Sequence, residues 1–161
     1  MSGLKRLFRS KWERCIGETE SPIEGLFLEA LCMTAIEHGY EVYPRMKAAP
    51  VACSVIIEPQ RWIDQYRVDF LVSYTFFGEL LEIVVECDGH EFHERTKEQA
   101  KRDRQRDRSL QSLGMEVFRF TGSELVASPN LCAAEVVDEI ESFQTRCFSS
   151  ALSRAQVRGA A

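Results

Sequence analysis

The sequence predicts an α/β fold built around a βαβ unit. A nearly all-apolar strand over 80–87, a helix over 94–113 and a strand over 115–120 follow one another within about 40 residues. This order and spacing predict two parallel strands joined by a right-handed crossover. An alternating apolar segment over 66–72 adds a strand ahead of the unit. The length of 161 residues fits one domain.

A first helix is expected to begin at Ser21-Pro22, where Ser is a favoured N-cap and Pro a favoured first residue. An apolar stripe at helical spacing follows between Ile23 and Leu31, and Gly39 is the expected end. Residues 41–64 contain three prolines, and their pattern predicts only a strand near 51–57.

A turn is expected at 77–79, between the strands over 66–72 and 80–87. Ser128-Pro129 predicts the start of a last helix, with an apolar stripe from Ala133 to Phe143. The chain is therefore divided into a basic N-terminal extension (1–20), one folded domain (21–148) and a flexible tail (149–161).

The composition favours a globular protein of the cytoplasm. Hydrophobic residues make up 45% of the chain, but no apolar run approaches the ~18 residues of a membrane span. The basic N-terminus lacks the apolar core of a secretory signal. The six cysteines are widely spaced without a C-x-x-C pair, so we expect them to be reduced.

Charge is unevenly distributed around the net value of −5. Residues 1–14 carry five basic and one acidic side chain, and residues 95–108 carry seven basic and three acidic ones. Each block has two interpretations. It is either a solvated helix face or a local positive potential that binds phosphates.

Two charged residues fall on the inward stripe of the helix over 94–113. Leu110 and Leu113 fix the stripe, and Gln99, Asp103 and Arg106 lie on it at helical spacing. Because charged residues are almost never buried unpaired, Asp103 and Arg106 either pair with each other or approach a polar site at the end of the strands.

Carboxylates gather at the same end of the predicted sheet. Glu86 and Asp88 close the strand over 80–87, and Asp69 lies on the neighbouring strand. Three carboxylates beside an apolar sheet repel one another and lose solvation. A hard divalent cation such as Mg²⁺ offsets this cost. The alternative is that loops or water solvate one or more of them.

His90 and His93 follow in the loop before the helix, but no further histidine or C-x-x-C pair completes a zinc site. Either histidine could orient a water molecule or contact a phosphate. The alternative is an ordinary exposed loop histidine.

A set of short motifs occurs in a fixed order. They are S-P-I-E (21–24), R-V-D-F (67–70), V-E-C-D-G-H-E-F-H (85–93), D-x-x-R-D (103–107) and V-F-R-F (117–120). In this order the chain resembles the PD-(D/E)xK restriction-endonuclease-like superfamily. More narrowly, it resembles a small bacterial domain of unknown function related to very-short-patch-repair (Vsr) endonucleases. The resemblance spans about residues 21–143.

The resemblance implies a restriction-endonuclease-like core, with a mixed four-stranded sheet flanked by helices and a metal-dependent nuclease site. It assigns Asp69 and Glu86 to the metal-binding acids and Glu24 to an acidic helper on the first helix. Asp88 stands where many relatives have the lysine of the E-x-K motif, although E-x-D-G recurs in the narrower branch. Asp103 and Arg106 match the helix signature of that branch.

These assignments favour an endonuclease that acts on DNA, with RNA as the alternative substrate, in repair or defence. Asp69, Glu86 and the Cys87 carbonyl would hold Mg²⁺ or Mn²⁺, which activates water and neutralises phosphate charge. Asp88, with His90 or His93, would position the water or a second ion. Nucleic-acid phosphates would be held by Lys97, Lys101, Arg104, Arg106 and Arg108.

The alternative function is a non-catalytic nucleic-acid-binding or scaffolding module with the same fold, because fold does not fix function. The absent lysine and the acidic net charge favour it. The oligomeric state is left open by the sequence.

Overall fold

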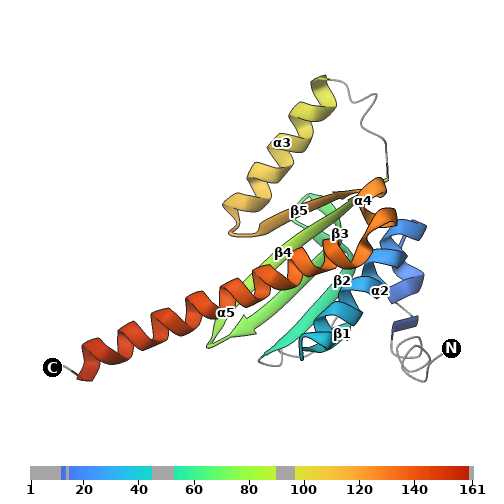
Figure 1. Ribbon diagram of the computed structural model, residues 1–161. Coiled ribbons are helices and arrows are strands. Elements are labelled where there is room, and N and C mark those ends of the chain that lie inside the picture. The colour runs from blue at the N-terminus through green and yellow to red at the C-terminus, as the bar shows by residue number, and fades with distance from the viewer. Residues whose placement is uncertain (1–11, 14, 45–52, 90–96, 160–161) are drawn as a thin grey trace.

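The computed structural model describes residues 12, 13, 15–44, 53–89 and 97–159, with backbone alone at 97–100 and 157–159. Within these ranges, five strands form one sheet in the order β1-β2-β3-β4-β5 (Figure 1). The strands are β1 (Glu41–Pro44), β2 (Ser54–Ile63), β3 (Tyr66–Phe76), β4 (Glu79–Asp88) and β5 (Glu116–Thr121). The helices are α2 (Pro22–Glu37), α3 (Lys97–Ser112), α4 (Gly122–Ala127) and α5 (Pro129–Gly159).

The predicted mixed sheet flanked by helices is confirmed. β4 and β5, which precede and follow α3 in the chain, pair in parallel, as the βαβ spacing predicted. β2, β3 and β4 are antiparallel neighbours. The strand number of four was wrong. The extra strand is β1, a four-residue edge strand beside β2 in which only Val42 is buried. Such a short strand carries no readable alternation.

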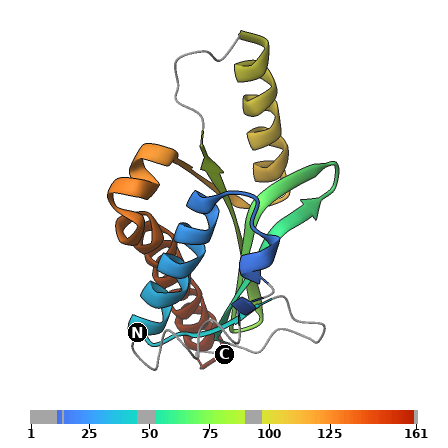
Figure 2. The same ribbon diagram turned by 90° about the vertical axis from the view of Figure 1, so that its right-hand side faces the viewer.

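Helices cover both faces of the sheet (Figure 2). Side chains of α2, α4 and α5 share the main hydrophobic core with one sheet face. Phe27 of α2 lies at its centre, with its ring 5.6 Å from that of Phe70 and 5.7 Å from that of Phe120. This burial packs α2 against β3 and β5 through Phe70 and Phe120.

Helix α3 covers the other face through a much smaller core. Leu110 is fully buried there with Ile63, Val68, Leu71 and Val84. The prediction that Leu113 also faces inward was wrong, because its side chain is 58% exposed. Leu110 is the one buried side chain among the described side chains of α3, residues 101–112. The helix is therefore anchored at its C-terminal end.

Local signals account for the elements around the site. The Ser21 side chain caps α2 and Pro22 follows it, as predicted, and Gly39 ends the helix with φ of +86°. Phe77 (φ +50°) and Gly78 (φ +80°) form the two-residue turn between β3 and β4. Two central residues with positive φ define a type I′ turn, which matches the strand twist.

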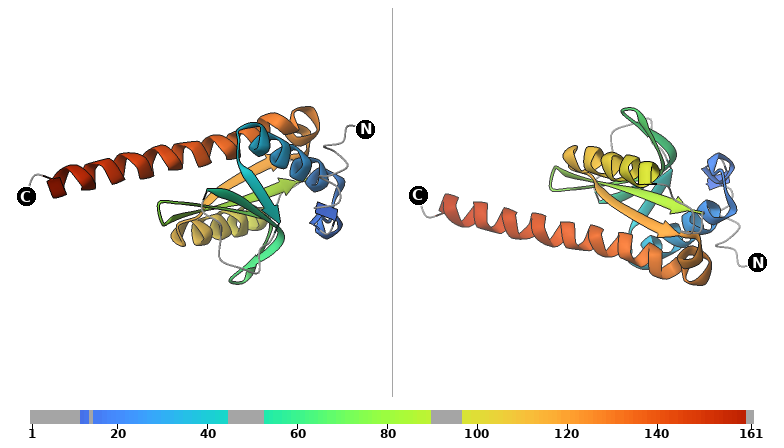
Figure 3. Two further views of the ribbon diagram at one scale, coloured as in Figure 1. Left: turned by 90° about the horizontal axis from the view of Figure 1, so that it is seen from below. Right: turned by 90° about the horizontal axis from the view of Figure 1, so that it is seen from above.

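The C-terminal part differs from the expectation in two ways. Helix α4 was not predicted, although Thr121 and Glu124 form a complete capping box at its start. Helix α5 runs for 31 residues to Gly159 and so includes 149–159, which the sequence assigned to the tail. Its second half projects beyond the sheet (Figure 3). None of the described helices combines the length and apolarity that crossing a membrane requires.

The described part of the N-terminal extension packs into the core. Residues 12, 13 and 15–18 are helical, and Trp12 (2% exposed) and Cys15 belong to the main core. All six cysteines are free thiols, as expected from their spacing.

Candidate active site

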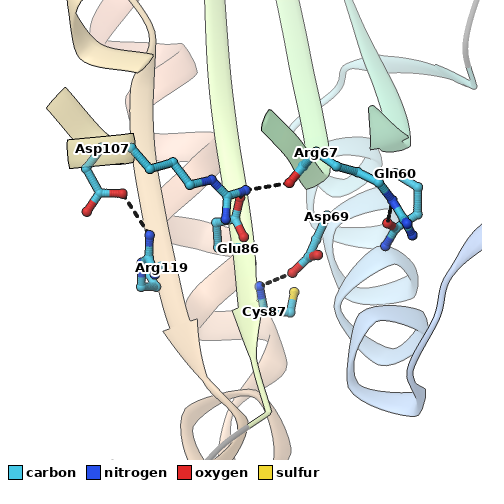
Figure 4. A network of polar contacts seen from close by, with 8 residues as sticks. Gln60, Arg67, Asp69, Glu86, Cys87, Asp107 and Arg119 are labelled. Atoms are coloured by element: carbon cyan, nitrogen blue, oxygen red, sulfur yellow. Dashed lines mark hydrogen bonds and ion pairs between the residues drawn. The ribbon is translucent and has the colours of Figure 1, made fainter. Parts of the chain in front are cut away.

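Asp69 and Glu86 come together on neighbouring strands. The β3–β4 register pairs Phe70 with Val85, so the residues beyond that pair are Asp69 on β3 and Glu86 on β4. Asp69 Oδ2 accepts a hydrogen bond from the Cys87 amide at 2.7 Å, which fixes it beside the end of β4 (Figure 4). The sheet thus holds two carboxylates side by side on the adjacent strands β3 and β4.

Glu86 is a buried acid, with 8% of its surface exposed. Its pKa is raised from 4.5 to about 7, chiefly by burial and to a smaller extent by Asp69, against the opposing effect of Arg106 and Arg119. Loss of solvation therefore outweighs the attraction of two arginines. A carboxylate in this environment gains from any cation that reaches it.

The pKa of Asp69 is also raised, chiefly by burial, while the hydrogen bond from Cys87 lowers it. Burial raises the pKa of the Cys87 thiol as well. The thiol is therefore neutral at physiological pH, which leaves the Cys87 carbonyl as the metal donor that the sequence analysis considered.

Arg106 reaches from α3 to the carboxylates. Its Nη2 donates to Glu86 Oε1 and to the Arg67 carbonyl oxygen (Figure 4). Of the two interpretations of the inward stripe, this contact favours an approach to a polar site. The next residue, Asp107, pairs with Arg119 at 2.7 Å, and Arg119 on β5 lies opposite Glu86 in the register.

A cavity of about 410 Å³ opens beside the C-terminal end of β4. Its lining joins Glu86, Cys87, Asp88 and Gly89 of β4 and the chain after it to residues of α2, α3 and β5. Those residues are Ser21, Ile23, Glu24, Arg106 and Arg119. Of the predicted acidic residues, Glu24, Glu86 and Asp88 line this cavity, whereas Asp69 is not among its lining residues.

Glu24 is buried in a polar network. Its carboxylate accepts hydrogen bonds from the Ser21 hydroxyl (2.7 Å), the Glu20 amide (2.8 Å) and Gln60 Nε2 (2.8 Å). Gln60 Oε1 in turn accepts from Arg67 Nε at 2.7 Å. The network links α2 to β2 and β3, so Glu24 supports the packing of the site whatever else it does.

Other predicted site residues are not among the described residues that line the cavity. His90 and His93 fall outside the described residues, and so does the side chain of Lys97. Lys101, Arg104 and Arg108 are exposed on α3, whereas Arg106 and Asp103 are half-buried. Sequence reasoning missed Gln60 and the role of Arg119. An arginine inside the short V-F-R-F strand was a signal for Arg119, whereas Gln60 carried none.

The donor set fits a hard divalent cation in part. No group of three acidic, histidine or cysteine side chains among the described residues forms a ready metal site. Two neighbouring carboxylates and a backbone carbonyl are nevertheless oxygen donors, and Mg²⁺ commonly takes one or two carboxylates, with water and substrate phosphates completing its shell.

The fold and this acidic cavity define an α/β domain of the restriction-endonuclease-like class. The family model REase_MTES_1575 matches residues 41–140, which is more than half of the chain. The chain therefore belongs to this family, a restriction endonuclease family. Neither the curated proteins nor the solved structures provide a match.

Proposed function

We propose that this protein is a metal-dependent endonuclease that hydrolyses phosphodiester bonds in DNA, with Mg²⁺ or Mn²⁺ as its cofactor. The observation that carries the proposal is the pair of neighbouring carboxylates on the adjacent strands β3 and β4, the half-buried Asp69 and the buried Glu86. Membership of a restriction endonuclease family supports the nuclease class. The motif order supports a relation to PD-(D/E)xK and Vsr enzymes.

Asp69, Glu86 and the Cys87 carbonyl are the residues that would hold the ion. When bound, a divalent cation activates water as a nucleophile and neutralises charge on the phosphate. Hydrolysis adds the oxygen of one water molecule to phosphorus and breaks one P–O bond. One proton of that water goes to the leaving oxygen and the other is released. Asp88 lines the cavity, where its carboxylate can accept that second proton.

The outer surface of α3 is the proposed nucleic-acid contact. Lys101, Arg104 and Arg108 are exposed on it, in one of the two chain segments with an excess of basic residues. Such contacts to phosphates provide affinity without sequence choice. The free cysteines support a cytoplasmic location, where thiols stay reduced.

A cleavage assay tests the proposal. The purified protein is incubated with supercoiled plasmid, single-stranded DNA and RNA, in Mg²⁺ and in Mn²⁺. Glu86→Gln removes one charge at the site, and Glu82→Gln removes one from the same strand outside the cavity. We expect cleavage of DNA by wild type and Glu82→Gln but not by Glu86→Gln. Equal cleavage by all three would reject this site.

One observation favours a second function, a non-catalytic binding module. Glu86 already forms an ion pair with Arg106, and position 88 holds an aspartate instead of a lysine. A module of this kind would bind DNA without cleaving any of the substrates in either metal. Its thermal stability would also show no Mn²⁺-dependent rise that Asp69→Ala or Glu86→Gln removes.

A further inference from the structure

Two arginines line the cavity beside the end of β4. Among the described residues that line it, Arg106 and Arg119 are the cations, and no lysine is present. Hydrolysis of a phosphodiester builds negative charge on the phosphoryl oxygens, and a fixed cation stabilises that charge. One of these two arginines is therefore the natural candidate for this role.

Arg119 is already engaged by a side chain suited to hold it. Its Nη2 lies 2.7 Å from Asp107 Oδ1, and both side chains are partly exposed. Asp107 belongs to the same turn of α3 as Arg106. This ion pair, with the buried Leu110, attaches α3 to the sheet. The backbone at residue 106 can therefore keep its place while the Arg106 side chain changes partner.

The contacts of Arg106 are incomplete. Nη2 donates to Glu86 and to the Arg67 carbonyl, but the buried Nε finds no acceptor among the described residues. A buried donor without a partner is unfavourable, because it has lost its hydrogen bonds to water. A phosphate offers several acceptor oxygens, and guanidinium binds it through two parallel hydrogen bonds. The present arrangement thus leaves a donor that a phosphate would satisfy.

The Glu86 carboxylate has two competing partners, Arg106 and the proposed metal ion. Arg106 occupies Oε1 of the same carboxylate that we assign to metal binding. The nearby guanidinium also repels a divalent cation. Binding of a cation to Glu86 and retention of Arg106 on it therefore oppose each other.

On the basis of the nuclease function proposed above, we propose that Arg106 is a catalytic residue. In this structure its guanidinium holds Glu86. With a divalent cation on that carboxylate, the Arg106 side chain would leave it and donate hydrogen bonds to the scissile phosphate. Arg106 thereby supplies the positive charge that a lysine at position 88 would otherwise provide.

The test combines metal binding and cleavage on the full chain. Mn²⁺ binding is measured by calorimetry without nucleic acid for wild type, Arg106→Met, Arg106→Lys and Glu86→Gln. The control is Arg154→Met, which removes an arginine that is 73% exposed near the far end of α5. Circular dichroism melts confirm that each variant is folded.

We expect Arg106→Met to bind Mn²⁺ about tenfold more tightly than wild type, because Glu86 has lost its competitor. The same variant should cleave DNA about 10²–10³-fold more slowly, because the phosphate has lost its cation. Arg106→Lys should restore part of the rate. Arg154→Met should match wild type in Mn²⁺ binding. A purely structural arginine would not produce tighter metal binding together with slower cleavage.

Two results would overturn the assignment. One is Mn²⁺ binding by Arg106→Met that is equal to or weaker than that of wild type. The other is undiminished cleavage by that variant. Failure of the underlying nuclease function has a different signature, in which Glu86→Gln binds Mn²⁺ as wild type does. If Arg106→Met is unfolded, Arg106→Lys provides the same comparison, with tighter Mn²⁺ binding and slower cleavage expected at smaller amplitude.

Discussion

The Asp69 carboxylate on β3 accepts a hydrogen bond from the Cys87 amide on β4, with 2.7 Å between Oδ2 and the nitrogen. The amide belongs to the residue directly after Glu86, so this hydrogen bond ties the Asp69 side chain to the backbone beside the second candidate metal-binding acid. Sheet hydrogen bonds fix the position of that amide, and Asp69 therefore has a defined place before any ion binds. Preorganisation of this kind reduces the cost of ordering ligands.

This contact separates the chemical role of Asp69 from its structural role. Asp69→Asn keeps an oxygen that accepts from the Cys87 amide, so we expect its free energy of unfolding to lie within about 0.5 kcal/mol of wild type. Asp69→Ala removes the acceptor and should lose about 1–3 kcal/mol. Both variants should lose metal-dependent cleavage. Urea denaturation and the plasmid assay measure the two effects.

Ser73 provides a matched control for Asp69. It lies on the same strand, four residues further on and opposite Glu82 in the register. Ser73→Ala should change neither cleavage nor metal binding. If Asp69→Asn cleaved DNA at the wild-type rate, Asp69 would have no place among the metal-binding residues.

The raised pKa of Glu86 predicts a pH dependence of stability. The pKa rises on folding from 4.5 to about 7. The stabilisation from Glu86 is therefore fully present below about pH 4.5 and is lost as the pH rises through about 7. Relative to Glu86→Gln, which does not titrate, wild type should lose on the order of 3 kcal/mol across this window.

Urea denaturation of wild type and Glu86→Gln at a series of pH values checks this prediction. Glu82→Gln, which keeps Glu86, should follow the wild-type curve. Parallel curves for wild type and Glu86→Gln would mean that Glu86 titrates near its ordinary pKa, and the buried-acid description of the site would then be wrong.

Glu24 has a structural role that is testable apart from catalysis. Glu24→Ala leaves the Glu20 amide and Gln60 Nε2 without their acceptor, so we expect a loss of about 1–3 kcal/mol of unfolding free energy. Glu24→Gln keeps one acceptor oxygen and should lose less. If Glu24→Gln abolished cleavage while retaining stability, the helper role implied by the family resemblance would gain support. Thermal melts and the plasmid assay together separate these outcomes.

Much of the fold could be predicted because its signals are local. The Ser21-Pro22 start of α2, the turn at Phe77-Gly78 and the β4–α3–β5 order each depend on a few consecutive residues or on one period. The same holds for the approach of Asp69 to Glu86, since adjacent strands with known faces bring their residues together.

The rest depends on contacts between distant parts of the chain. Helical spacing placed Arg106 on the inward face, but its partner Glu86 lies 20 residues earlier on another element. Leu113 is exposed because α3 contacts the sheet only near Leu110. The helical spacing of apolar residues does not show where along its length a helix contacts the sheet. Gln60 adopts a φ of +51°, a conformation that the sequence does not predict because glutamine rarely adopts positive φ.

The exposed basic residues of α3 predict a salt-dependent step in DNA binding. Replacing Lys101, Arg104 and Arg108 by Gln removes three positive charges without touching the cavity. Each phosphate contact contributes about one unit to the slope of log K against log salt. The triple variant should therefore bind DNA more weakly at every sequence, with a slope smaller by about three units. Its Mn²⁺ affinity should be unchanged, because Glu86 keeps Arg106.

Fluorescence anisotropy with a labelled duplex at several salt concentrations measures the slope, and calorimetry measures Mn²⁺ binding. A control with three substitutions on α5, Arg146, Arg154 and Gln156 to alanine, removes two charges from exposed positions on another helix. It should retain the wild-type slope if DNA lies along α3. If instead the α5 control reduces the slope and the α3 variant does not, the DNA path runs over α5, and α3 serves the site through Arg106 alone.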